Sequence, residues 1–421
     1  MKTTKFIFMA ALALMTAACS NDDNDLTQQP AKAEGIPFTA TISMGESAST
    51  RALTENGTKI EATWAVDDKV ALIHNGVKDE MTVSAVNAGV ATITGTITGS
   101  PSGGDAVTII YPSDAADVTT GNVKSDWLST QDGTLKGTSG TSIEEKYDVR
   151  KGSGALNASG TSLDGTVSLT NQNAIFKLTL KDIDGTNDVS ATSVVISDQT
   201  GVVTTVTPAS GYENAMYVAL PTTATTLKFL VTGSDSKKYF NMASSLSLGA
   251  NYYQSTIKLA TVGDVILSTG KCAKAGTGSP VAMIAYLGNG SDCTNGLAIQ
   301  LNASHVEKNW NDAKTYASGL TAVPGGTWRL PSKADWQNMF VGCAKSGDAG
   351  ASDNMNPIAG FREKIGATGI TWQSYAYWSS TGSGSYAWNV DVALSVSYAY
   401  ARFNENVHTS TLFYVLACLV F

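Results

Sequence analysis

Side chains able to perform catalysis are few and scattered along this 421-residue chain. The histidines, His74, His305 and His408, lie in different segments, and no G-x-S-x-G, H-E-x-x-H or Gly-Lys-Ser/Thr motif is present. An isolated histidine is more often a surface or core residue than a general base. The sequence therefore predicts that the protein is not an enzyme and uses no cofactor.

The cysteines suggest structural roles. Cys19 stands apart, whereas the other four are all in about the last third of the chain. In an oxidising compartment these four could form two disulfides, and sequence leaves all three connectivities open. No C-x-x-C spacing favours a metal site. The apolar surroundings of Cys343 and Cys418 predict that these cysteines are buried and paired rather than reactive thiols. The disulfide candidates are Cys272, Cys293, Cys343 and Cys418.

A stretch near the C-terminus is rich in aromatic and small polar residues, the composition of antibody paratopes. Strand alternation puts Trp388, Val390 and Val392 on one face and Asn389 and Asp391 on the other, and it separates the even-numbered residues 398–404 from Ala399, Ala401 and Phe403. We expect the polar and tyrosine-bearing faces to contact a ligand; the alternative is a solvated aromatic surface. The candidate ligand-binding residues are Tyr375, Tyr377, Tyr386, Asn389, Asp391, Tyr398, Tyr400, Arg402, Asn404, Asn406 and His408.

The N-terminus predicts export. An apolar stretch from Phe6 to Ala18 is too short to span a bilayer, and the small residues before Cys19 resemble a lipobox, which implies a signal peptide over 1–18 and lipidation of Cys19. Residues 19–35 form an acidic, polar tether that resembles the surface-export signal of Bacteroidetes lipoproteins. An ordinary secretory signal or a solvated tether is the alternative. We expect an outer-membrane lipoprotein precursor at the cell surface.

Composition limits the class of protein. Charged residues make up 15% of the chain and the net charge is −8, which argues against a nucleic-acid partner. Period-two alternation, as in VATITGTITG at 90–99 and TLKFLVTG at 226–233, predicts strands with one buried face. A break near 150–165 divides this region. The fold is therefore expected to be mainly β, with one sandwich over 36–160 and a second over 161–260.

Residues 261–421 have a different pattern. WNDAKTYASGL at 310–320 predicts a short helix with Trp310, Ala313 and Ala317 on one apolar stripe. A second helix is predicted to begin after Ser332, which with Asp335 has the spacing of a capping box. Helices among strands make this last region α+β.

The β-rich region resembles a known family. The segments TRALTENGTKIEATWAVDDKVAL, SLTNQNAIFKLTL and MYVALPTTATTLKFLVTG are similar to the fimbrillin pilins of Bacteroidetes over residues 36–260. The ordered set AMIAYLG, GLAIQL, WNDAKTYA, TWRLPS, YWSST and VLACLVF resembles C-type-lectin-like domains over 262–421. The WND triplet opens a predicted helix rather than a late strand, so calcium binding is not expected.

The fimbrillin resemblance implies an assembly route. A surface protease would cut between Arg51 and Ala52, the first strand would leave, and a strand from another subunit would take its place. The apolar C-terminal segment resembles a central strand of the lectin-like domain, which implies a fimbrial tip adhesin. Its partners would be other fimbrillin subunits and a surface glycan or protein. The alternatives are a permanently lipid-anchored binding protein that does not polymerise and an enzyme that oxidises cysteines.

Overall fold

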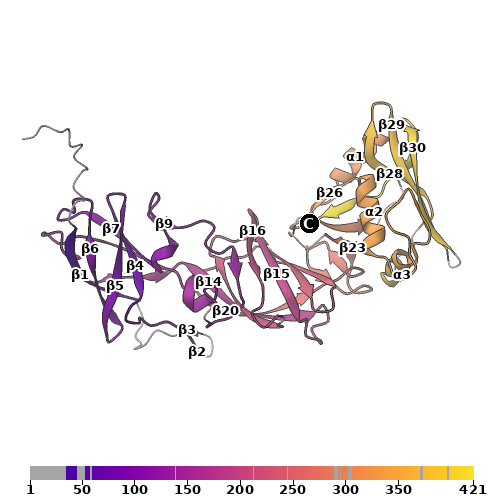
Figure 1. The fold of residues 1–421 in the computed structure, drawn as a ribbon. Coiled ribbons are helices and arrows are strands. Elements are labelled where there is room, and N and C mark those ends of the chain that lie inside the picture. Colours follow the sequence, from indigo (N-terminus) through magenta and orange to yellow (C-terminus); the bar gives the residue numbers. More distant parts are fainter. Residues whose placement is uncertain are drawn as a thin grey trace, which may run out of the picture. The chain divides into compact units, whose positions relative to one another are not determined.

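The computed structural model describes residues 35–44, 53–56, 59–137, 139–211, 213–243, 245–288, 293, 295–301, 306–369, 373–395 and 398–421 (Figure 1). Cys19, Arg51 and Ala52 lie outside these residues, so the expectations placed on them stay predictions. The described chain is mainly β, with 48% strand and 10% helix, as expected. None of its helices is long and apolar enough to cross a membrane.

The first sheet has eight strands, and a short chain segment links its two edges. β12 pairs in parallel with β1 at one edge, β13 pairs with β11 at the other, and only Leu169 separates β12 from β13. Residues 167–171 therefore close the sheet around its core. In spatial order the strands are β12 (Val167–Ser168), β1 (Ile36–Ser43), β6 (Val90–Ile97), β5 (Val77–Asn87), β4 (Lys69–His74), β7 (Ala106–Tyr111), β11 (Arg150–Ala155) and β13 (Thr170–Asn171).

Strand β1 follows the predicted alternation closely. Phe38, Ala40 and Ile42 are buried in the first core, whereas Thr39 between them is exposed. All eight residues of β1 pair antiparallel with β6, but only two pair with β12. Smaller elements flank the sheet: β2 (Thr54–Asn56) pairs with β3 (Lys59–Glu61), β8 (Ala116–Asp117) pairs with β9 (Asn122–Val123), and short helical turns cover Ser113–Ala115 and Ile143–Tyr147.

The second domain is a sandwich of two sheets around one apolar core. Leu178 and Val218 come from one sheet, and Ile196 and Phe229 come from the other. The first sheet has the order β10 (Thr130–Gln131), β16 (Gly201–Val206), β15 (Ala191–Asp198), β18 (Leu227–Gly233) and β19 (Lys238–Ala243); the second has the order β17 (Ala215–Pro221), β14 (Asn173–Asp182) and β20 (Tyr252–Leu259).

The boundary that we expected at residue 160 does not separate the strands of the first domain from those of the second. β10 precedes that position but pairs with β16 of the second sandwich, whereas β12 and β13 follow it but belong to the first sheet. Gln131 fixes β10 in place, because its side chain donates to the Ala219 carbonyl and accepts from the Ala219 N–H, both at 2.8 Å. The two sandwiches are thus interleaved along the sequence.

Glu55 attaches β2 to the second sandwich. Its carboxylate accepts hydrogen bonds from the Lys177 ammonium at 2.8 and 2.9 Å, the Tyr217 hydroxyl at 2.5 Å, the Tyr252 hydroxyl at 2.9 Å and the Gln254 amide at 3.1 Å. These bonds, led by that from Lys177, lower the pKa of Glu55 from 4.5 to about 2. The carboxylate therefore stays ionised well into the acidic range.

The C-terminal domain contains two six-stranded sheets with helices packed on them. One sheet has the order β22 (Cys272–Ala273), β21 (Val265–Leu267), β23 (Pro280–Leu287), β24 (Gly296–Gln300), β32 (Cys418–Val420) and β26 (Thr327–Arg329). The other has the order β25 (Glu307–Lys308), β31 (Phe413–Tyr414), β28 (Ala376–Ser383), β29 (Tyr386–Leu394), β30 (Ala399–His408) and β27 (Asn354–Met355).

Both predicted helices are present. α1 spans Trp310–Ser318, and α2 spans Lys333–Gly342 with a complete capping box between Ser332 and Asp335. A further helix, α3 (Ala359–Ala367), was not predicted; its N-cap, Ile358, makes no side-chain capping bond. Instead, the Asp348 carboxylate accepts from the N–H groups of Ala359 and Gly360 at 3.0 and 2.7 Å. Local signals therefore identified the helix capped by its own N-cap residue and missed the one capped from 11 residues upstream.

The second sandwich packs directly against the C-terminal domain. The rings of Phe240 on β19 and Phe421 lie 4.6 Å apart, and Met242 shares an apolar cluster with Trp328. The Thr261 hydroxyl also donates to the Lys238 carbonyl at 3.0 Å. This junction is built like a protein core rather than like a free linker.

Candidate functional site

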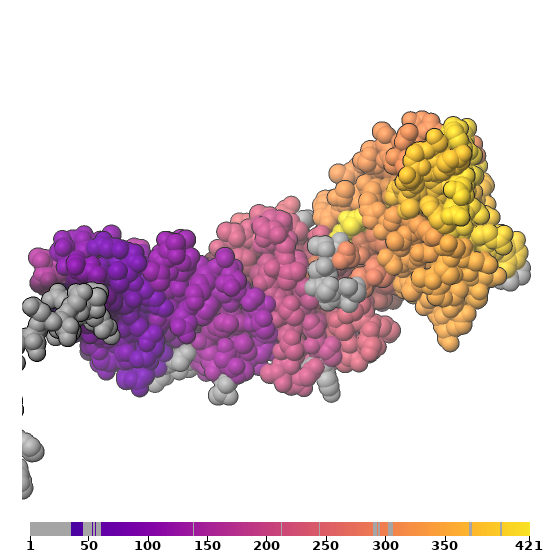
Figure 2. Space-filling view, turned by 45° about the horizontal axis from the view of Figure 1, so that its top comes forward, coloured from indigo at the N-terminus to yellow at the C-terminus, as the bar shows by residue number. Residues whose placement is uncertain are grey.

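The exposed face of β30 carries the clearest candidate binding surface. Tyr398 is 56% exposed, its ring stacks on that of Tyr400 with centroids 6.1 Å apart, and the Arg402 guanidinium lies 5.8 Å from the Tyr400 centroid. Ala399, Ala401 and Phe403 are buried, as alternation predicted. We call Tyr398, Tyr400 and Arg402 the tyrosine patch. In Figure 2 part of this domain's surface has the yellow of the last residues of the chain, among which β30 lies.

Asp391 lies beside the tyrosine patch. It pairs in register with Arg402 across β29 and β30, and it is half-buried. Because directly paired residues of antiparallel strands point to the same face, the patch combines two aromatic rings, a cation and a carboxylate. Such a surface can stack against a flat ligand and hydrogen-bond its polar edges, but it holds no general base paired with a nucleophile.

Asn389 does not lie on an open surface, whereas its partner Asn404 is half-buried. Asn389 is 3% exposed, and its Oδ1 accepts a hydrogen bond of 3.0 Å from Asn404 Nδ2. Asn389 does point to the opposite face of β29 from Val390, as predicted, but that face of the sheet is covered at the position of Asn389. Trp378, paired with Asn389, is fully buried and its Nε1 donates to the Lys308 carbonyl at 2.8 Å. The prediction for Asn389 is wrong because a neighbouring segment covers that part of the sheet.

Tyr377 is a core residue. It is 2% exposed, its hydroxyl donates to the Gln373 carbonyl at 2.8 Å, and its ring lies 6.0 Å from that of Trp336. Its strand, β28, has partners on both sides, and both faces of the sheet are covered at this point. The prediction for Tyr377 is therefore wrong, whereas Tyr375 is half-buried and stacks on Tyr414 at 3.8 Å.

The remaining predicted residues lie at the other end of β29 and β30. Tyr386 is 51% exposed and pairs in register with His408, with their rings 5.8 Å apart. Asn406 is exposed and has a φ of 58°, next to a register shift in the ladder, where asparagine tolerates a left-handed conformation. Tyr400 pairs with Ala393, seven residues from Tyr386, so the two ends lie roughly 23 Å apart. The structure thus separates one predicted surface into two.

The four C-terminal cysteines lie in the described part of the chain and are all thiols. Cys272 and Cys418 belong to one sheet but are four strand spacings apart, or roughly 19 Å, which no disulfide can bridge. Cys343 Sγ instead donates to the Ala285 carbonyl at 3.6 Å, and Cys293 Sγ donates to the Val195 carbonyl at 3.5 Å. The expected disulfides are therefore absent from the described residues, and for Cys272 and Cys418 the sheet itself keeps the two thiols apart.

The thiols are also poor nucleophiles. Burial raises the pKa of Cys272, Cys343 and Cys418 to about 12. Because the thiolate is the reactive form, these residues are almost entirely protonated at neutral pH. Among the residues with described positions, no three His, Cys, Asp or Glu side chains group closely enough to hold a metal ion.

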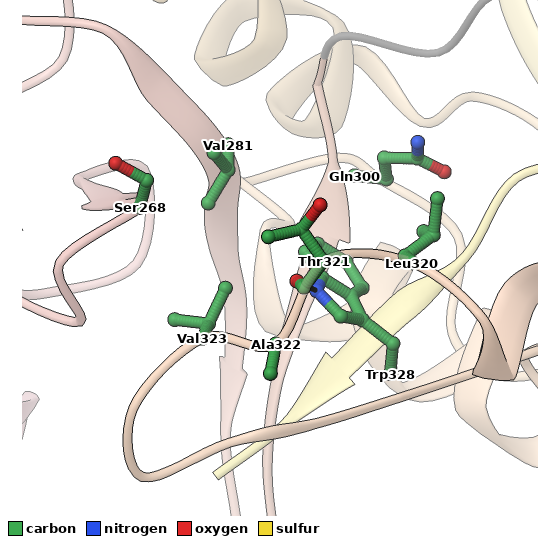
Figure 3. A pocket seen from close by; sticks show the side chains of 8 residues that line it. All are labelled: Ser268, Val281, Gln300, Leu320, Thr321, Ala322, Val323 and Trp328. Carbon is green, nitrogen blue, oxygen red and sulfur yellow. Dashed lines mark hydrogen bonds between the residues drawn. The ribbon is translucent and has the colours of Figure 1, made fainter.

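A small cavity of about 210 Å³ lies elsewhere in the C-terminal domain (Figure 3). Figure 3 shows Val281, Leu320 and Val323 around Thr321, with Trp328 behind them. Trp328 Nε1 donates to the Thr321 carbonyl at 2.9 Å. None of the lining side chains titrates near neutral pH, so this cavity offers apolar contact and hydrogen bonds but no acid–base group. Sequence reasoning missed it because its residues come from separate segments.

Comparisons with known proteins give weak similarities. No family model matches this sequence, and no curated protein matches it. A fimbrial protein from Bacteroides ovatus is 11% identical, with 92% of this chain and 99% of that chain covered and a TM-score of 0.25. A fimbrial assembly protein from Parabacteroides distasonis is 13% identical, with 53% and 90% covered and a TM-score of 0.29. Identities and TM-scores this low do not assign the chain to a family.

Proposed function

We propose that the protein is a cell-surface fimbrial adhesin that accepts a strand from another subunit and binds a glycan or protein through its C-terminal domain. The observation that carries this proposal is the geometry of β1. Its eight residues form one uninterrupted ladder with β6, whereas only two residues pair with β12. Removal of β1 would leave a slot lined by unpaired backbone groups of β6 and by apolar side chains, which an extended segment of another chain can fill.

The sequence beyond β1 fits this route. Arg51 is the proposed processing site, and Ala52 would become the new N-terminus. The next residue, Leu53, is 2% exposed and its backbone N–H donates to Glu144 Oε1 at 2.9 Å. Glu55 is held by the second sandwich. Cleavage after Arg51 would therefore leave the body of the protein anchored and would free only the segment that contains β1.

A position at the tip of the fimbria is part of this proposal, with the C-terminal domain as its adhesive part. β32 lies between β24 and β26 and is a structural strand of that domain. The tyrosine patch on β30 is our proposed ligand surface, since tyrosines supply large contact areas at low entropic cost. In this proposal the precursor is lipidated at Cys19 and processed at the outer membrane.

A second possibility is a binding protein anchored permanently through Cys19. It is favoured by the burial of Phe38, Ala40 and Ile42 on β1, which complete the first core without any partner.

The N-terminal residue of the protein purified from the cell surface distinguishes these two functions. Mass spectrometry should find Ala52 on fimbrial material, and an Arg51→Ala variant should stay out of fibres. A lipidated Cys19 on all surface material would instead establish the anchored form.

Ligand binding by the tyrosine patch can be tested separately with the double variant Tyr398→Ala/Tyr400→Ala. We expect it to lose adhesion to the surface that the wild type binds, with no change in thermal stability. Tyr386→Ala is the comparison variant, because this candidate residue is similarly exposed at the opposite end of the sheet and tests whether that end binds instead. Loss of adhesion in the comparison variant but not in the double variant would reject the patch as the binding surface.

A further inference from the structure

A second surface with binding chemistry lies where the second sandwich meets the C-terminal domain. Here a cleft of about 460 Å³ is lined by Lys237 and Lys238 from the sandwich and Lys364 from α3. This volume falls within the range of small-molecule sites. We call it the lysine cleft.

The charge of the lysine cleft contrasts with that of the chain. The net charge of the protein is −8, yet the only ionised side chains that line this cleft are three lysines. Lys237 is neutralised by Asp235, 3.0 Å away at the margin. The ammonium of Lys238 donates to Thr232 Oγ1 at 2.5 Å, and that of Lys364 donates to the Val262 carbonyl at 3.1 Å. These two bonds satisfy donors without cancelling charge.

The walls of the cleft are aromatic and firmly placed. Tyr239 and Tyr286 face it from opposite domains, and the Tyr239 hydroxyl is fixed by a 2.9 Å bond to Asp235. The end of α2 lies so close to β23 that a Cβ on Gly342 would be 2.3 Å from the Ala285 carbonyl oxygen. With the Phe240–Phe421 contact, this packing fixes the two walls before any ligand arrives.

We propose that the lysine cleft binds a sugar that carries a carboxylate, such as a hexuronate unit of a glycan. The two uncancelled ammonium groups would each take a carboxylate oxygen, and the tyrosine rings would cover the C–H faces of the sugar. Lysine suits this task because its ammonium is a compact point charge with several donors. The site is separate from the tyrosine patch and does not depend on strand exchange.

Titration calorimetry on the intact protein at low salt tests this site. The ligand is a disaccharide that ends in glucuronic acid, and the control ligand is the same disaccharide ending in glucose. The variants are Lys238→Gln and Lys364→Gln, whose amides can still donate to Thr232 and Val262. Lys69→Gln is the matched control, because Lys69 is an exposed lysine of the first sheet whose ammonium donates to Thr82 Oγ1 at 2.7 Å, as that of Lys238 does to Thr232. Thermal unfolding checks that each variant is folded.

We expect the acidic disaccharide to bind and the neutral one to bind at least about tenfold more weakly, since only the acidic one can form charge-assisted hydrogen bonds with the two ammonium groups. Each of Lys238→Gln and Lys364→Gln should weaken binding about tenfold, whereas Lys69→Gln should change it little. Equal binding of both disaccharides, no binding of the acidic one, or wild-type affinity in both cleft variants would overturn the proposal. Tighter binding of a glutamate-rich peptide would replace the sugar with a protein ligand.

Discussion

Replacement of Glu55 by glutamine should release β2 and β3 from the second sandwich. The wild-type carboxylate accepts from an ammonium, two phenolic hydroxyls and an amide, and all four donors come from strands β14, β17 and β20. A glutamine has one accepting oxygen and no charge. The variant therefore loses the ion pair with Lys177 and cannot satisfy all of the remaining donors.

The pKa shift gives the size of this effect. A fall from 4.5 to about 2 corresponds to about 3 kcal/mol of preferential interaction with the ionised form. The side chains of Glu55 and Lys177 are 24% and 35% exposed, so water screens part of this interaction. We expect Glu55→Gln to lower the free energy of local opening by about 1–2 kcal/mol at neutral pH.

The effect should depend on pH in a defined direction. Because folding lowers the pKa of Glu55, its ionisation stabilises the folded protein fully above pH 4.5, and this contribution is lost as the pH falls towards 2. The wild type and Glu55→Gln should therefore differ most near pH 7 and converge near pH 2.

Hydrogen exchange followed by mass spectrometry measures this opening in the peptides that contain β2 and β3. At pH 7 their protection should fall about 5- to 30-fold in Glu55→Gln. Glu80→Gln is the control, because Glu80 is an exposed glutamate on β5. Unchanged protection in Glu55→Gln, or a loss that is equally large near pH 2, would refute the reasoning.

Two further predictions concern buried groups. Phe38→Ala should destabilise the first domain by about 3–5 kcal/mol, because a fully buried ring is removed from β1. The measurement is urea denaturation monitored by hydrogen exchange of the β6 amides. Thr39→Ala, on the exposed face, should destabilise it far less, and equal effects would contradict our description of β1. Iodoacetamide at pH 8 should leave Cys343 and Cys418 unmodified in the native protein and label both after unfolding, since burial raises their pKa to about 12. Rapid native labelling, seen by mass spectrometry, would show that these thiols are accessible.

Features that depend on neighbours in sequence were predictable. The start of α2 follows from Ser332 and Asp335, whose capping bonds span three residues. The exposed and buried faces of β30 follow from alternation alone, so Tyr400 and Ala401 were placed correctly.

Features that depend on distant segments were not predictable. Alternation correctly places Asn389 and Val390 on opposite faces of β29. It cannot reveal that Trp378 and the segment before α1 cover the face that carries Asn389. The cysteine spacing likewise gives no information on which strands separate Cys272 from Cys418. The lysine cleft joins residues more than 120 positions apart, such as Lys238 and Lys364, and no periodicity links them.

The closure of the first sheet by residues 167–171 has a consequence for the order of folding. β1 can pair with β6 as soon as residue 97 is available, but its other edge waits for Val167, which pairs with Ile42 across 125 residues of chain. Closing so long a loop is slow, because its entropic cost precedes the contacts that compensate it. As the chain emerges from its N-terminus, β1 therefore has one open edge until the segment leading into the second sandwich is available, and the first sheet cannot close before residue 171.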